Sequence, residues 1–122
     1  MSNNTTNSEI KFQIELDENK VPEKLSWTAR DGGIVNEEAK AIMLSIWNSK
    51  NKETLRIDLW TKDMPVDEMK IFFHQTLVAM ADTYDKATQD DKNVSYYERF
   101  LRLFCGKIGV EIIKVLKRTF CY

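Results

Sequence analysis

The segment Glu53–Thr88 constrains the fold most, because a strand pattern runs almost directly into a long helix pattern. Every second residue of its first part is apolar, namely Leu55, Ile57 and Leu59, which is the period of a strand with one buried face. Beyond Pro65 the apolar residues recur every three or four positions, which is the period of an amphipathic helix. Proline suits the first turn of a helix, because the N–H that it lacks would have no partner there. The segment therefore predicts a strand, a sharp turn and a helix of about 23 residues, roughly 34 Å long.

The helix pattern after Pro65 is apolar on one face only. Its apolar positions are Met69, Phe72, Phe73, Leu77, Met80, Ala81, Tyr84 and Ala87. A single apolar face on so long a helix indicates that the helix lies across a sheet. We therefore expect Phe73, Leu77 and Met80 to be buried there.

The sequence before this segment is typical of strands. Apolar and polar residues alternate in Ile10–Leu16 and again from Leu25 to Ala29. Two such runs joined by the polar turn Asp17–Glu23 predict an antiparallel hairpin. The preceding residues 1–8 are polar and are predicted to form a disordered tail.

Residues 36–47 fit two structures. As a helix, the segment would be capped by Asn36 and would gather its apolar side chains on one face. As a strand, it would be apolar on both faces. Leu44 favours the strand, because it would point away from the apolar face of the helix, whereas a central strand covered by a helix can be apolar on both sides. Such a strand would return through the turn Asn48–Glu53 and make a second hairpin with residues 54–61.

A second helical stripe follows the charged break Gln89–Asn93. The spacing of its apolar residues would let this helix pack beside the first one. These residues are Tyr96, Tyr97, Phe100, Leu101, Phe104 and Ile108. Together these patterns predict one α+β domain over residues 9–122. We expect an antiparallel sheet of about four strands, arranged as two hairpins, packed by one long helix and a C-terminal helix. Residues 95–122 are expected to form a basic helical tail.

Composition narrows the function classes. The chain has 122 residues and a net charge of −1, which gives no basic surface for nucleic acid. Only residues 95–122 are cationic, with 6 basic and 2 acidic side chains. No run approaches the ~20 apolar residues that a membrane span needs, and the first residues have no signal-peptide pattern. We therefore expect a cytoplasmic protein without a transmembrane segment, with membrane-surface attachment of the cationic tail as a weaker alternative.

Candidate catalytic and ligand-binding residues are few. His74 is the only histidine, and the residues one helical turn away offer no carboxylate to orient it, so we expect it to border the core. Cys105 and Cys121 lack the spacing of a metal site, which favours free or buried thiols. The carboxylates of Asp67 and Glu68 are explained by the positive end of the helix dipole. The sequence therefore predicts no catalytic residue, no metal and no cofactor.

Aromatic residues give the strongest indication of a binding surface. Trp60 falls in the same phase of its strand as Arg56 and Asp58, opposite to the apolar phase. An aromatic side chain flanked by opposite charges suits a protein interface, because the aromatic supplies buried area and the charges set orientation. We therefore name Trp60, Arg56 and Asp58 as candidate partner-binding residues. The alternative is that Trp60 is buried in the core.

Several long runs also carry a family resemblance. The runs LRIDLWTKDMPVDEM and FFHQTL, with QIELDENKVPEKLSWTA upstream, resemble the gliding-motility protein GldC family of Bacteroidetes. The resemblance extends from Ile10 to Asp91. Members of that family are small soluble accessory components associated with the gliding and secretion machinery, and no reaction is established for them. The resemblance therefore implies a role more than a mechanism.

Two functions stay open at this point. The first is a non-enzymatic accessory or interaction protein that binds protein partners of the gliding and secretion machinery, with a homo-oligomer also open. The second is a small ligand-binding or enzymatic domain with a pocket between the sheet and the long helix. A pocket that combined His74 with Asp58, Asp63 or Asp67 would favour the second function.

Overall fold

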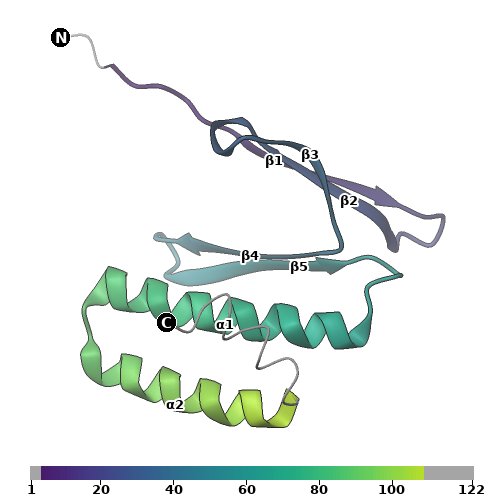
Figure 1. Ribbon diagram of the computed structural model, residues 1–122. Helices are drawn as coiled ribbons and strands as arrows, with labels where there is room; N and C mark the ends of the chain where they lie inside the picture. The colour runs from purple at the N-terminus through teal and green to yellow at the C-terminus, as the bar shows by residue number, and fades with distance from the viewer. Residues whose placement is uncertain (1–3, 109–122) are drawn as a thin grey trace. The chain divides into compact units, whose positions relative to one another are not determined.

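The computed structural model describes residues 4–108, except for the side chains of residues 91, 97 and 104–108. The chain divides into two compact units, Met1–Met64 and Pro65–Tyr122. Within the described residues the first unit contains five antiparallel strands and the second contains two helices (Figure 1), so the predicted α+β class is confirmed. Neither of these two described helices is long and apolar enough to cross a membrane. The single domain over residues 9–122 and the disordered residues 1–8 stay predictions.

The first three strands form one antiparallel sheet in the order β1–β2–β3. Their bounds are Ile10–Leu16 for β1, Pro22–Ala29 for β2 and Ile34–Ala39 for β3. The predicted first hairpin is therefore confirmed as β1–β2. Phe12 lies opposite Trp27 in this pair, and their rings stack with centroids 6.4 Å apart. Leu25 of β2 is completely buried and forms the centre of the apolar face of this sheet.

β3 is a separate strand that the sequence analysis did not predict, because the single strand expected over residues 36–47 is divided at Lys40 into the end of β3 and most of β4. Its residues are mostly polar, so its own pattern is weak, and pairing with β2 holds it in place. Gly33 leads into β3 at a φ of 76°, a conformation that favours glycine. Asn36, the expected cap of the alternative helix, instead lies in β3 and donates its N–H to Thr28 Oγ1 over 3.0 Å. The helix alternative for residues 36–47 is therefore wrong, and β3 brings the described strands to five.

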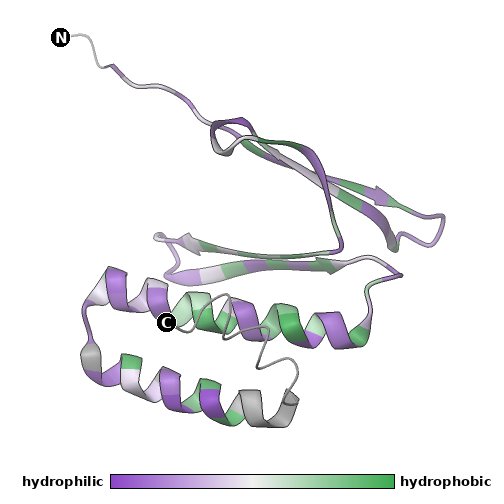
Figure 2. Ribbon diagram, viewed as in Figure 1, coloured by the Kyte–Doolittle hydropathy of each residue, from purple (hydrophilic) through white to green (hydrophobic). Residues whose placement is uncertain are grey.

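The remaining two strands, β4 (Ala41–Asn48) and β5 (Glu53–Trp60), pair as a separate two-stranded sheet. This pair confirms the second predicted hairpin and the choice of a strand for the residues around Leu44. The register places Leu44 opposite Ile57, so the apolar residues of both strands gather on one face. Figure 2 shows the alternation as green and purple segments along β5. The residues between these apolar positions lie on the second face, which is mixed because it carries both polar and apolar side chains.

A polar junction connects the two sheets, and it consists of Asp17, Lys40, Thr61, Lys62 and Asp63. Lys40 is the single residue between β3 and β4, and its Nζ lies 2.8 Å from Asp63 Oδ2. Thr61 is buried directly after β5, where it donates its N–H to the Lys40 carbonyl and its hydroxyl to Asp63 Oδ1, over 2.9 and 2.6 Å. Lys62 Nζ lies 2.5 Å from Asp17 Oδ2, in the turn between β1 and β2. The end of β5 is thereby fixed both to the β3–β4 link and to the first hairpin.

The second unit is a helical hairpin of α1 (Val66–Thr88) and α2 (Asp91–Ile108). α1 starts directly after Pro65 and has 23 residues, which confirms the predicted start and length. It ends at Gln89, whose φ of 55° lets the chain turn into α2. α1 and α2 pack against each other, as the second apolar stripe predicted. Between them lies an apolar hollow of about 130 Å³, lined by Leu77, Met80, Tyr84, Phe100 and Leu101.

The apolar side chains of α1 are less buried than expected. Phe73 is 45% and Met80 is 54% exposed, whereas Leu77 is half-buried, so the expected burial of Phe73 and Met80 is wrong. The buried residues of α1 are His74 and Ala81, which lie two turns apart on one face. The centre of the covered face is thus shifted around the helix by one residue from the centre of the predicted stripe. Phe73 and Met80 therefore lie at the edge of the covered face. The expected packing of α1 on a sheet stays a prediction.

Candidate functional site

The mixed face of β4–β5 brings the three predicted partner-binding residues together. Arg56, Asp58 and Trp60 alternate along β5, with Ser45 of β4 directly opposite Arg56. Arg56 donates one hydrogen bond from Nη1 to Ser45 Oγ over 2.7 Å and another from Nη2 to Asp58 Oδ1 over 2.9 Å. Trp60 lies beside this cluster and is 56% exposed. The alternative that Trp60 belongs to the core is therefore wrong.

Trp47 is a member of the same face that the sequence analysis did not single out. It lies on β4 opposite Thr54 and is 61% exposed. The register was the signal that could have found it, because opposite residues of an antiparallel pair share a face. Once the turn between β4 and β5 is fixed, Trp47 must lie on the side of Arg56. We call Trp47, Arg56, Asp58 and Trp60 the tryptophan face.

The chemistry of the tryptophan face suits binding. The side chains of Arg56 and Asp58 are each 44% exposed, and so accessible an ion pair adds little to stability. The pair instead presents both charges in a fixed arrangement that a partner can match. The two indole rings offer large apolar areas at a small cost in side-chain entropy, as binding hot spots do. Ser45 accepts its hydrogen bond from an arginine, which stays protonated and cannot act as a base, so this contact does not activate the serine as a nucleophile.

His74 lies in the buried centre of the covered face of α1 and is 2% exposed. Burial lowers the pKa of its imidazole below the usual range, because the charged form loses solvation. The ring is therefore neutral at neutral pH. Burial confirms that His74 belongs to the core rather than to the surface. His74 is not one of the four residues of the tryptophan face. It also does not line the apolar hollow between α1 and α2 or the polar hollow described below.

The polar junction holds two carboxylates with lowered pKa values, those of Asp63 and Asp17. Hydrogen bonds from Lys40 and Thr61 lower the pKa of Asp63 to about 2. The hydrogen bond from Lys62 lowers the pKa of Asp17, whose Oδ1 also accepts the N–H of the residue four positions on. Both carboxylates are therefore charged at all but strongly acidic pH. Their side-chain partners, Lys40, Thr61 and Lys62, all belong to the junction, so we assign both carboxylates a structural role in holding the sheets.

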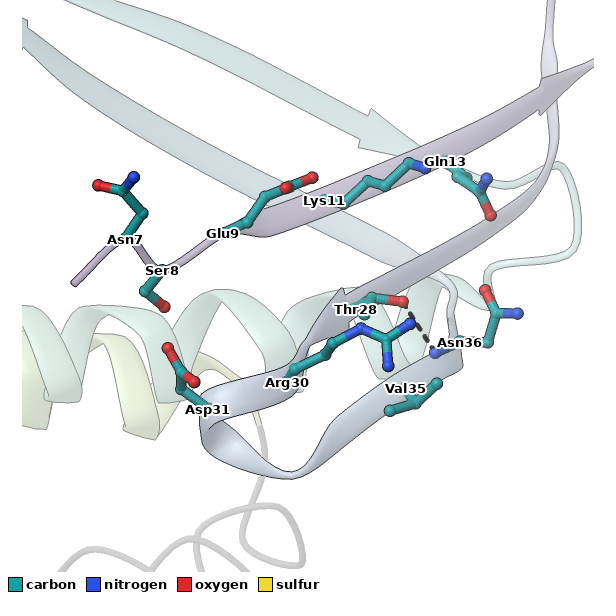
Figure 3. A pocket seen from close by; sticks show the side chains of 10 residues that line it. All are labelled: Asn7, Ser8, Glu9, Lys11, Gln13, Thr28, Arg30, Asp31, Val35 and Asn36. Carbon is teal, nitrogen blue, oxygen red and sulfur yellow. Dashed lines mark hydrogen bonds between the residues drawn. The ribbon is translucent and has the colours of Figure 1, made fainter.

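A polar hollow of about 550 Å³ lies on the first sheet, and no sequence pattern had indicated it. Figure 3 shows its lining, which comes from the residues before β1, from β1 itself, from the end of β2, from the 3₁₀ turn Arg30–Gly32 that follows it and from the start of β3. The lining residues are Asn7, Ser8, Glu9, Lys11, Gln13, Thr28, Arg30, Asp31, Val35 and Asn36. Charges of both signs are mixed in the lining, so the hollow does not concentrate potential of one sign for an ion. It is a polar hollow whose lining indicates no preferred ligand class.

Among the side chains that the structure describes, no three of His, Cys, Asp and Glu lie close enough together to hold a metal ion. The side chains of Cys105 and Cys121 and the residues beyond 108 lie outside the described part of the chain. The expectations of free or buried thiols and of a basic helical tail therefore stay predictions.

Comparison with known proteins gives one match. A family model described as gliding motility-associated protein GldC-like matches residues 22–110. The matched segment runs from the start of β2 through α2, and so contains the tryptophan face, all of the polar junction except Asp17, and most of both units. No curated protein and no solved structure matches the chain. Because the family match covers more than half of the 122 residues, the protein belongs to the GldC-like family of gliding motility-associated proteins.

Proposed function

We propose that the protein is a non-enzymatic component of the gliding machinery and its associated secretion apparatus, which captures a protein partner through the tryptophan face. The observation that carries the proposal is the pair of exposed indole rings, Trp47 and Trp60, on the face of the Arg56–Asp58 ion pair. Family membership supports the link to gliding motility. The proposed place of action is the cytoplasm.

Two properties of the tryptophan face favour a protein over a small molecule as its occupant. The face belongs to an open two-stranded sheet, and neither described hollow includes any of its four residues. Small-molecule sites are concave and enclose most of their ligand, whereas protein interfaces are flatter and use aromatic and arginine side chains as anchors. The face has aromatic residues and an arginine and lines neither of the two described hollows, which matches the second description.

The test is capture of partners by the tagged full-length chain in extracts of a gliding bacterium, with mass spectrometry of the captured proteins. Trp60→Ala should weaken capture of the main partner by more than about 1 kcal/mol, roughly fivefold in affinity, because a hot-spot indole is lost. The melting temperature should change little, since the ring is more than half exposed. Fractionation of the same cells checks the cytoplasmic part of the proposal.

Two further variants complete the experiment. Tyr96→Ala is the matched control, because it also removes an exposed aromatic ring but lies in α2. It should capture partners as the parent does. His74→Ala should leave capture by the folded fraction intact, because the ring is buried in α1 and is not one of the four residues of the tryptophan face. Equal capture by the parent and the Trp60→Ala variant would contradict the proposal. Loss of function on removing His74, with folding unchanged, would favour the enzymatic or ligand-binding alternative.

A further inference from the structure

β1 is an edge strand of the first sheet, and its outer side is unpaired among the described residues. The strand order β1–β2–β3 ends at β1, and all seven residues of β1 are exposed. The strand contains no proline, and its pairing with β2 is irregular only at its last step, between Glu15 and Leu16. An exposed, regular edge presents a row of unsatisfied N–H and C=O groups that can pair with a further strand.

The apolar side chains of β1 are also incompletely covered. Ile10, Phe12, Ile14 and Leu16 share one face of the strand and are between 37% and 63% exposed. Their β2 neighbours Trp27 and Leu25 cover one side of this row, and nothing described continues the row beyond β1. A strand added at this edge would cover the row from its open side and remove apolar area from water.

The sequence of β1 indicates which strand fits. Two copies of IKFQIEL can pair antiparallel about a two-fold axis through Gln13. The opposite residues are then Ile10 with Leu16, Lys11 with Glu15, Phe12 with Ile14, and Gln13 with itself. The apolar pairs fall on one face, and the charged pairs, which have opposite signs, fall on the other. Cross-strand pairs of both kinds stabilise a sheet.

Other symmetric registers lose this match. A two-fold axis through Phe12 or Ile14 shortens the pairing and puts Gln13 opposite a charged residue. Lys11 and Glu15 then no longer meet. An axis that puts residues of opposite phase together would place apolar side chains against polar ones. The register centred on Gln13 is therefore the one that aligns all seven residues and both charge pairs.

We propose that β1 pairs with β1 of a second copy of this chain, so that two three-stranded sheets join into one continuous sheet. The contact is isologous, as in most symmetric dimers, because each copy contributes the same seven residues. It goes beyond the proposed function, since β1 precedes the family match and belongs to a different sheet from the tryptophan face. Dimerisation would give the assembly two tryptophan faces, and hence two attachment points for partners.

The test is sedimentation velocity of the full-length chain over a series of concentrations. The parent should form a dimer. Lys11→Glu places like charges opposite each other at both symmetric positions, and should weaken the dimer by at least about tenfold. The reverse change, Glu15→Lys, is made together with Lys24→Glu, because Glu15 lies opposite Lys24 within the hairpin and the two should keep opposite signs.

Mixing the two variants gives the decisive result. Each variant alone should be largely monomeric. Their equimolar mixture should dimerise, because the Lys11→Glu site of one copy then lies opposite the Glu15→Lys site of the other, and the unchanged Lys11 and Glu15 still meet across the axis. Lys50→Glu, the same charge change in the turn between β4 and β5, and Trp60→Ala should both dimerise as the parent does. Circular dichroism confirms that each variant is folded.

Three outcomes would overturn the proposal. One is a parent that stays monomeric up to about 1 mM, where even weak specific pairs form. The second is a dimer that tolerates Lys11→Glu. The third is a mixture of variants that does not associate. None of these outcomes bears on partner capture by the tryptophan face, so the two proposals fail independently.

Discussion

The three-stranded sheet and the β4–β5 hairpin use the same alternation of residues, but they differ in where their tryptophans lie. Trp27 is in the apolar phase of β2, where it is half-buried and stacks on Phe12. Trp47 and Trp60 are in the polar phase of their strands and are more than half exposed. Packing on the apolar face accounts for the position of Trp27, but it does not account for the positions of Trp47 and Trp60. The phase of an aromatic residue, more than its presence, therefore separates a core residue from a candidate binding residue.

The largest expected effect tests whether apolar side chains are more deeply buried in the three-stranded sheet than in the β4–β5 hairpin. Leu25→Ala should lower the free energy of unfolding by about 2 to 5 kcal/mol, because Leu25 is completely buried at the centre of the first sheet. Leu55→Ala, in the apolar phase of β5 but 54% exposed, should cost about 1 kcal/mol or less. Urea denaturation of both variants provides the measurement. Equal costs would break the comparison, since the apolar face of the hairpin would then be buried in solution.

The polar junction offers an intermediate effect, because it connects the two regions compared. Thr61→Val keeps the side-chain shape but removes the hydroxyl that donates to Asp63. The variant should lose about 1 to 3 kcal/mol of unfolding free energy, the range for a buried hydrogen bond to a charged group. Thr54→Val is the control, since Thr54 lies at the opposite end of β5 and is exposed. Its cost should be within about 0.5 kcal/mol of zero. A similar cost for both variants would show that the junction does not hold the sheets.

The smallest expected effect is the pH dependence of the same junction. The pKa of Asp63 is about 2 in the folded protein, below the ordinary carboxyl value of 3.8 in the unfolded chain. The ionised form therefore stabilises the fold fully above pH 4, and this contribution is lost as the pH falls from 4 towards 2. Asp63→Asn should remove it.

The measurement for this prediction is the difference in melting temperature between the parent and Asp63→Asn as a function of pH. The difference should be constant above about pH 5 and shrink below about pH 4. Comparing the two proteins cancels the effects of Asp17 and His74, whose pKa values are also lowered. A difference that grows as the pH falls would contradict the assigned role of Asp63.

The parts of the fold that were predicted correctly are those whose local pattern is sufficient. β1, β2, β5 and α1 each have a clear period, and Pro65 marks the start of α1, whereas β4 was favoured over a helix only by the position of Leu44. β3 was missed because its mostly polar residues become a strand only through pairing with β2, which is not a local property. The covered face of α1 was misplaced because His74 and Ala81, a polar and a small residue, lie at its centre.

The candidate site shows the same limit. The phase of Trp60, Arg56 and Asp58 could be predicted from β5 alone, because strand period fixes the face of every residue. Trp47 required the register of β4 on β5, and the hydrogen bond from Arg56 to Ser45 required it as well. The polar junction could not be predicted, since Asp17, Lys40 and Asp63 lie far apart in sequence. Only the folded chain brings them together.

The single-residue link at Lys40 has a mechanical consequence. A pull on the β4–β5 hairpin reaches the first sheet along two parallel routes, the covalent link through Lys40 and the contacts of Lys62 with Pro22 and Asp17. The covalent route has almost no slack, because one residue spans at most about 3.6 Å. Tension would therefore load the two sheets together instead of first extending a loose tether. Such a link would transmit a pull from one sheet to the other with little lost extension.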